Sequence, residues 1–188
     1  MSLILITGMP GVGKTTIMRH VGTELQRRAI AFDGFYTEEL RSSSGERSGF
    51  DIVTFDGKRA PLARTSDSIR NAPAKNRVGK YTVCVTEFES VALPALAIRS
   101  TANLLLLDEI GKMELKSRPF EDRLQQIVDA VTAPPEGRLK FVATVPLKAS
   151  LNIVERLKRT PGVQLFHVTV SNRDKMRQDI LEAVVRMV

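Results

Sequence analysis

Residues 8–15 read Gly8-Met9-Pro10-Gly11-Val12-Gly13-Lys14-Thr15, and this stretch decides how the rest of the chain is interpreted. The apolar run at residues 3–6 precedes it, and a segment with apolar residues at helical spacing opens at Thr16. Glycines allow consecutive backbone N–H groups to approach an anion that a side chain would keep away. We therefore expect a strand, a phosphate-binding loop and a helix, in that order.

The residue types at the end of this loop indicate its ligand. Lys14 supplies a point charge for the outer phosphates of a nucleotide, and it is a candidate catalytic residue because the amides alone do not offset the charge that develops there. Thr15 offers a hydroxyl group to Mg²⁺. The candidate nucleotide-binding residues of the loop are Gly8, Met9, Pro10, Gly11, Val12, Gly13, Lys14, Thr15 and Thr16.

A second pattern follows the apolar run at residues 104–107, which ends in Asp108-Glu109. A buried parallel strand would carry Asp108 to the carboxyl edge of the sheet, where the ligands of such loops bind. Its carboxylate can hold the Mg²⁺ shell there, as in a Walker B motif. Glu109 is then placed to polarise water for attack on the γ-phosphate. The sequence therefore predicts Thr15 and Asp108 as the metal site, and Glu109 with Lys14 as the catalytic residues.

Composition limits the class of protein. A chain of 188 residues with 43% hydrophobic residues suits a single domain spanning 1–188, and no apolar run is long enough to cross a membrane. Cys84 is the only cysteine, which fits a reducing compartment, so we expect a soluble cytoplasmic protein. The net charge of +7 favours anionic partners, which nucleotides already satisfy. Nucleic acid stays an unsupported alternative partner, and the oligomeric state is open.

Strand and helix patterns alternate along most of the chain, which predicts a three-layer α/β fold with a mainly parallel sheet. We expect strands at residues 3–7, 30–36, 104–107, 139–145 and 163–168, and helices at 14–28, 87–98, 120–131, 151–159 and 174–188. Residues 37–86 break this rhythm and read as a β-rich insertion lying over the nucleotide domain. Asp56-Gly57 predicts a hairpin within it, and residues 42–46 an exposed loop.

Weaker signals give further candidates. Asn172-Arg173 follows the last strand, where Arg173 could stack on a base or approach the phosphates, or else simply begin a helix. Thr144 ends a strand and could sense the γ-phosphate, although a strand-end threonine needs no such role. Lys112 and Glu114 could reach phosphate or orient water, or could form a surface pair.

One ambiguity concerns the base. Residues 108–111, Asp-Glu-Ile-Gly, also fit the Asp-x-x-Gly pattern of switch-type GTPases. Those proteins read guanine with an Asn-Lys-x-Asp or Thr-Lys-x-Asp segment, and this chain has neither. We therefore expect weak discrimination between ATP and GTP.

Several blocks together carry a family resemblance. They are the loop at residues 8–15, Asp33-Gly34-Phe35-Tyr36-Thr37-Glu38-Glu39, Gly49-Phe50-Asp51, residues 77–81, residues 108–114 (Asp-Glu-Ile-Gly-Lys-Met-Glu) and Asn172-Arg173. With these blocks the chain resembles the cancer-related nucleoside-triphosphatase family over nearly its whole length. The resemblance implies a RecA-like core and a slow, Mg²⁺-dependent hydrolase of ATP, GTP and other nucleoside triphosphates.

Two other functions compete with hydrolysis. A nucleotide or small-molecule kinase would use the same loop but exclude water beneath an arginine-rich lid, for which residues 148–159 are the candidate. An RNA-binding or scaffold protein controlled by nucleoside triphosphates would use the insertion as its interaction surface. Phosphate release with and without acceptors separates these alternatives.

Overall fold

The computed structural model describes residues 2–66, 73–97, 102–132, 139–148 and 151–188. Its strands are β1 (Leu3–Gly8), β2 (Asp33–Arg41), β3 (Arg47–Thr54), β4 (Arg59–Thr65), β5 (Arg77–Val78), β6 (Tyr81–Val83), β7 (Leu104–Leu107), β8 (Lys140–Pro146) and β9 (Gln164–Val168). Its α-helices are α1 (Lys14–Arg27), α2 (Val85–Ala95), α3 (Arg118–Thr132), α4 (Asn152–Lys158) and α5 (Arg173–Val185), with 3₁₀ turns η2 (Ala74–Asn76) and η3 (Glu114–Lys116). The described strands form one sheet in the order β5-β6-β4-β3-β2-β7-β8-β1-β9.

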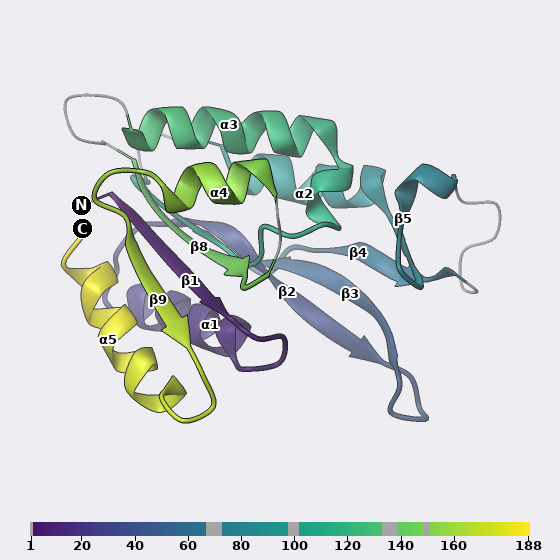
Figure 1. Ribbon diagram of the computed structural model, residues 1–188, viewed down its shortest axis with the longest axis horizontal. Helices are drawn as coiled ribbons and strands as arrows, with labels where there is room; N and C mark the ends of the chain where they lie inside the picture. Colours follow the sequence, from purple (N-terminus) through teal and green to yellow (C-terminus); the bar gives the residue numbers. More distant parts are fainter. Residues whose placement is uncertain (1, 67–72, 98–101, 133–138, 149–150) are drawn as a thin grey trace.

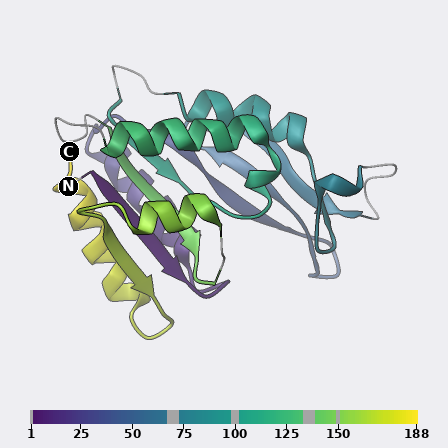
Figure 2. The same ribbon diagram turned by 45° about the horizontal axis from the view of Figure 1, so that its top comes forward.

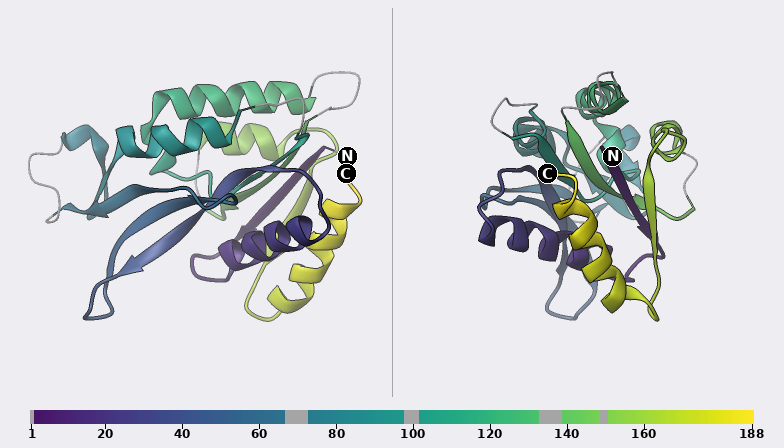
Figure 3. Two further views of the ribbon diagram at one scale, coloured as in Figure 1. Left: turned by 180° about the vertical axis from the view of Figure 1, so that it is seen from behind. Right: turned by 90° about the vertical axis from the view of Figure 1, so that its left-hand side faces the viewer.

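The central strands are buried on both faces. In β1, Leu3 and Leu5 belong to one apolar core, whereas Ile4 and Ile6 belong to the other, because successive side chains of a strand point to opposite faces. Helices α2, α3 and α4 cover the first face and lie side by side (Figure 2). Helices α1 and α5 cover the second face, as the end view in Figure 3 shows. The predicted three-layer α/β fold is confirmed.

Five of the described strands pair in parallel, namely β2, β7, β8, β1 and β9. Strand β8 lies between β1 and β7, so one strand separates the glycine-rich loop from the Asp108-Glu109 pair. Because all five run in the same direction, the segments that follow β1, β7, β8 and β9 lie at one edge of the sheet, and β2 continues past this edge (Figure 1). That edge carries the candidate site.

The strand predicted at residues 30–36 begins later and ends later in the structure. The helix α1 ends in a tight turn in which Ala29 has a φ of 55° and Ile30 N–H bonds to the Leu25 carbonyl, so residues 30–32 lie outside the sheet. Strand β2 begins at Asp33 and continues to Arg41. Its first residues pair with β7, and the remainder stays extended because β3 supplies its hydrogen bonds.

The prediction that residues 37–86 lie over the nucleotide domain was wrong. Strands β3, β4, β6 and β5 continue the same sheet in antiparallel pairing beyond β2, so the whole sheet is mixed. The hairpin at Asp56-Gly57 is confirmed: Gly57, at a φ of 92°, lies in the turn between β3 and β4. Residues 42–46 are exposed, as expected. Residues 67–72 of this region lie outside the described part.

The remaining elements lie close to their predicted places. Helix α2 begins slightly before the predicted residue 87 and ends at Ala95, earlier than the predicted residue 98, which itself lies outside the described residues. Cys84, half-buried just before α2, has a thiol pKa raised by burial, which favours the protonated form. Among the described residues, no helix has the length and apolar character that crossing a membrane requires.

Candidate active site

The glycine-rich loop joins β1 to α1, as predicted. Gly13 directly precedes the helix with a φ of 109°, a conformation that residues with a side chain rarely adopt. A Cβ atom at Gly8 would lie 2.4 Å from the Val168 carbonyl oxygen, so the loop packs against the end of β9 without room for a side chain there. The backbone therefore has the conformation that a phosphate-binding loop requires. The loop leads directly into the N-terminus of α1, which is the positive end of the helix dipole.

Lys14 is the first residue of α1 and is only 8% exposed. Its ammonium group turns back over the loop, where Nζ donates to the Gly8 carbonyl at 3.2 Å and lies 3.6 Å from Glu109 Oε2. A buried cation at this place is expected to attract the outer phosphates of a nucleotide more strongly than an exposed one, because less water screens it.

Asp108 is the point where three segments meet. Its buried carboxylate accepts hydrogen bonds from the hydroxyls of Thr15 (2.7 Å) and Thr37 (3.1 Å) on Oδ2, and of Thr144 (2.5 Å) on Oδ1. The Thr37 backbone N–H also bonds to Oδ2, at 3.3 Å. These donors come from α1, β2 and β8 and fix the carboxylate beside the loop.

The hydrogen bonds of Thr144 bear on its two alternative roles, a sensor of the γ-phosphate or a threonine that only ends a strand. The sequence left open whether its hydroxyl senses phosphate. In the structure the side chain is fully buried and bonds to Asp108, while its backbone carbonyl accepts the N–H of Ile110. Thr144 is therefore a support for Asp108 and for the turn that follows β7.

The residues around Asp108 fit the predicted Mg²⁺. Thr15 and Asp108 present oxygen atoms 2.7 Å apart, and oxygen ligands are those that Mg²⁺ prefers. The described residues contain no group of three or more acidic, histidine or cysteine side chains arranged to hold a metal. Such a sparse set suits Mg²⁺, which usually keeps several waters and binds substrate phosphates along with one or two carboxylates.

Glu109 lies opposite Lys14 and lines the same cleft as the loop, with a side chain that is 33% exposed. Burial raises the pKa of its carboxyl group, and the neighbouring Asp108 charge raises it further, whereas Lys14 lowers it. A carboxylate with a raised pKa is a better proton acceptor than a free one. Its place beside the cleft and its basicity both suit a group that activates water.

Glu114 is buried near Glu109 and Asp108 and does not line the cleft. The surface reading of Lys112 and Glu114 is therefore wrong for Glu114, although Lys112 is exposed. Burial, followed by the charge of Glu109, raises the pKa of the Glu114 carboxyl to about 8. A pKa of about 8 favours the neutral carboxylic acid form of this side chain at neutral pH.

We expect this burial to make stability depend on pH. Glu114 titrates near 4.5 when unfolded and near 8 when folded, so the folded state binds more protons between these values and the free energy of unfolding falls as pH rises across them. Each pKa difference of one corresponds to about 1.4 kcal/mol. Glu114→Gln should flatten this fall, which denaturant titrations of both proteins between those pH values measure. Parallel pH curves for the two proteins would contradict the burial of a neutral acid.

A cleft of about 700 Å³ runs along the carboxyl edge of the sheet. One end is formed by the loop, Thr16, Arg19 and Glu109, and the β8 end contributes Pro146, Leu147 and Lys148. The cleft then continues over the antiparallel strands, where Thr37, Glu38, Glu39, Arg47 and Phe50 line it. The cleft therefore extends beyond the part that the glycine-rich loop lines.

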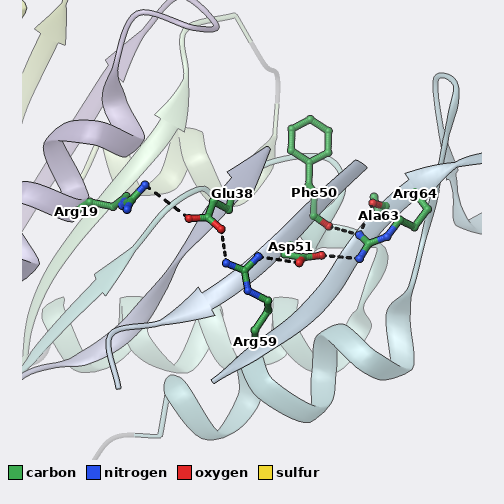
Figure 4. Close-up of polar contacts among 7 residues, drawn as sticks. All are labelled: Arg19, Glu38, Phe50, Asp51, Arg59, Ala63 and Arg64. Carbon is green, nitrogen blue, oxygen red and sulfur yellow. Dashed lines mark hydrogen bonds and ion pairs between the residues drawn. The ribbon is translucent and has the colours of Figure 1, made fainter. Parts of the chain in front are cut away.

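An ion-pair network supports the far wall of this cleft (Figure 4). Glu38 on β2 lies 3.6 Å from Arg19 of α1 and also pairs with Arg59 of β4. Arg59 in turn contacts the buried Asp51 at 2.9 Å, and Arg64 contacts it at 2.6 Å. Because Asp51 is buried and carries two arginine partners, the network is expected to fix β2, β3 and β4 relative to each other.

Five residues that line the cleft had no role predicted from the sequence, namely Arg19, Thr37, Glu38, Arg47 and Phe50. A signal for Thr37 was present, since the polar run Thr37-Glu38-Glu39 follows Phe35-Tyr36 near the end of the parallel segment of β2. Arg19 reaches the cleft from α1, whereas Glu38, Arg47 and Phe50 line it because β3 pairs with β2 and extends the sheet. That extension depends on long-range pairing.

Asn172 and Arg173 lie at the start of α5 and do not line this cleft. The Asn172 side chain accepts the Thr169 N–H at 2.8 Å and donates to the His167 carbonyl at 3.0 Å, so it holds the turn after β9. Arg173 is exposed. The structure thus brings the loop, Asp108 and Glu109 together at this cleft. A contact of Asn172 and Arg173 with the nucleotide stays a prediction.

The strand, loop and helix, with an acidic pair ending a strand two places away in the sheet, define a P-loop nucleotide-binding protein. The NTPase family model matches residues 3–181, and the chain belongs to this family. THEP1 of Thermotoga petrophila, a nucleoside-triphosphatase, is 42% identical over 95% of this chain and 90% of its own length.

Two solved structures extend the comparison. The crystal structure of THEP1 from the hyperthermophile Aquifex aeolicus matches 96% of this chain and 97% of its own with a TM-score of 0.76, at 36% identity. The solution structure of a human cancer-related nucleoside triphosphatase matches 98% of this chain and 97% of its own with a TM-score of 0.78, also at 36% identity. The resemblance expected from the sequence blocks is thereby confirmed.

Proposed function

We propose that this chain is a cytoplasmic, single-domain nucleoside-triphosphatase that hydrolyses ATP, GTP and related triphosphates to diphosphate and phosphate with Mg²⁺. The observation that carries the proposal is the placement of Lys14 and Glu109 on facing sides of one cleft, 3.6 Å apart, beside the Thr15–Asp108 pair. A cation for the phosphates, an oxygen site for the metal and a basic carboxylate therefore lie together. The names of the relatives as nucleoside-triphosphatases support the same chemistry.

In this mechanism the loop amides and Lys14 bind the phosphate chain. They stabilise the negative charge that develops as the γ-phosphoryl group separates from the diphosphate. Thr15 and Asp108 would hold Mg²⁺, which supplies charge neutralisation at the phosphate oxygens when bound. Glu109 orients a water molecule and accepts its proton as the water oxygen bonds to phosphorus. The bond from phosphorus to the bridging oxygen breaks, and the diphosphate leaves.

We expect weak selectivity for the base. Neither an Asn-Lys-x-Asp nor a Thr-Lys-x-Asp segment, with which switch-type GTPases read guanine, occurs in the chain. Values of kcat/KM for ATP and GTP should therefore agree within about tenfold, a difference of about 1.4 kcal/mol. Phosphate release across a panel of nucleoside triphosphates with Mg²⁺ tests both this expectation and the proposed function. A thousandfold preference for either nucleotide would reveal a base-recognition element, and Arg173→Ala kinetics would then be measured first.

The continuation of the cleft over β2 and β3 favours a kinase as the second candidate, because an acceptor could lie beside the γ-phosphate near Glu38, Arg47 and Phe50. The expected arginine-rich lid has less support. In α4, Arg156 pairs with Asp129 of α3 at 2.6 Å and Lys158 pairs with Glu155, so these cations are engaged away from the cleft. Lys148 lines the cleft, and residues 149–150 of the expected lid lie outside the described part. Hydrolysis is therefore the better-supported function.

A further inference from the structure

Glu114 is a buried carboxyl group for which the mechanism above has no use. It lies in η3, just after the turn that carries Glu109, and it is 4% exposed. Its Oε2 accepts a hydrogen bond from the Gly111 N–H at 3.1 Å. Because it does not line the cleft, Glu114 does not touch the substrate. Its hydrogen bond links it to the turn at residues 109–111, which carries Glu109.

Gly111 shows how closely the two glutamates approach this turn. A Cβ atom built on Gly111 would lie 2.8 Å from Glu114 Oε2 and 3.3 Å from Glu109 Oε1. The two carboxyl groups therefore converge on the same point of the backbone, where a side chain at position 111 would displace one of them.

Two further contacts hold the same turn. The Ile110 N–H bonds to the Thr144 carbonyl at 3.0 Å, which fastens the turn to β8. The Leu115 N–H bonds to the Gly111 carbonyl at 3.2 Å, which fastens it to η3. The Glu114 carboxyl is the side-chain member of this set, and it binds the Gly111 N–H, two residues after Glu109.

We propose that Glu114 is a positioning residue for hydrolysis, and that its neutral carboxyl group, by accepting the Gly111 N–H, holds the turn so that Glu109 faces the cleft opposite Lys14. This inference rests on the proposed function. The charged groups that face Glu114 are Glu109 and Asp108, with Lys14 beyond Glu109. A third negative charge here would repel both carboxylates, and the raised pKa of Glu114 shows that the neutral form is favoured.

Two substitutions at position 114 separate this role from simple core packing. Glu114→Gln keeps a neutral side chain with an oxygen that accepts the Gly111 N–H, so kcat should stay within about threefold of wild type. Glu114→Leu has a similar volume but no acceptor, so Glu109 is held less firmly and kcat should fall about tenfold or more. The dissociation constant for a nucleotide should change less than about twofold in both variants, because neither alters the loop or Lys14. Glu121→Leu, which removes an exposed carboxyl from α3, is the matched control and should leave kcat unchanged.

Gly111→Ala keeps the test independent of how well Leu packs at position 114. Its Cβ would enter the space between the two carboxyl groups, so kcat should again fall with little change in nucleotide affinity. Steady-state phosphate release, nucleotide binding and thermal unfolding are measured on the same preparations. The proposal is overturned if Glu114→Leu and Gly111→Ala both hydrolyse ATP as wild type does, or if Glu114→Gln loses as much kcat as Glu114→Leu. A wild-type protein that binds but does not hydrolyse ATP would instead refute the proposed function.

Discussion

Lys14→Ala is expected to lower kcat for ATP hydrolysis by about 10²–10³-fold or more. The ammonium group lies over the loop, nearly buried and 3.6 Å from Glu109, where the outer phosphates would come closest to it. Without it the loop amides face the charge of the transition state alone, and removing one such preorganised group costs a factor of this size. Steady-state phosphate release with saturating Mg²⁺ and ATP measures the effect.

Folding should survive this change, because Lys14 makes its contacts with loop carbonyls and Glu109 and not with either apolar core. Lys175→Ala, which removes an exposed lysine from α5, is a suitable control and should hydrolyse ATP as wild type does. Unchanged kinetic constants in a folded Lys14→Ala protein would rule out the loop as the active site.

Glu109→Gln is expected to lower kcat by about 10²-fold or more while nucleotide affinity stays near the wild-type value. The amide keeps the size of the carboxyl group and leaves Thr15 and Asp108 in place, but it cannot accept the proton of the attacking water. The variant should therefore bind ATP and fail to consume it. Nucleotide binding measured by calorimetry, together with phosphate release from the same preparation, tests both halves of this expectation.

A kinase would behave differently in the same experiment. Its wild-type form would release only traces of phosphate alone and would consume ATP rapidly once an acceptor was added. If Glu109→Gln hydrolysed ATP as fast as wild type, the assignment of Glu109 as the group that activates water would be wrong.

We also expect the wild-type protein to hydrolyse ATP slowly. An activating arginine supplied to such a site raises kcat by about 10³–10⁵-fold, and a protein that acts without one lacks this acceleration. Arg19, the arginine of α1 that lines the cleft, is held at Glu38.

The sequence predicted the centre of the site because its signals are local. The loop at residues 8–15 and the pair Asp108-Glu109 each combine an apolar strand with chemistry-bearing residues directly after it, and parallel strands bring their carboxyl ends to one edge. The structure places Thr15 2.7 Å from Asp108, as the metal-site prediction requires. Their roles in metal binding and catalysis stay predictions that the variants test.

Features that depend on long-range pairing were not predicted from the sequence. Nothing within residues 37–86 indicates that β3 pairs with β2 and extends the main sheet, so the far wall of the cleft was missed with it. The polar residue Glu114 reads as a surface residue from its type, and only the packing of η3 beneath the turn shows that it is buried. Conversely, Asn172 has a suitable position after a strand, yet its side chain is occupied by the turn that it holds.

Hydrolysis of ATP in H₂¹⁸O, without any acceptor, tests the central claim most directly. If Glu109 activates water at the γ-phosphate, wild-type protein with Mg²⁺ releases phosphate that carries one oxygen from the solvent, the ADP carries none, and Glu109→Gln produces this labelled phosphate about 10²-fold more slowly. A wild-type protein that releases no labelled phosphate and consumes ATP only when an acceptor is added, or a Glu109→Gln variant that produces labelled phosphate at the wild-type rate, would contradict the account.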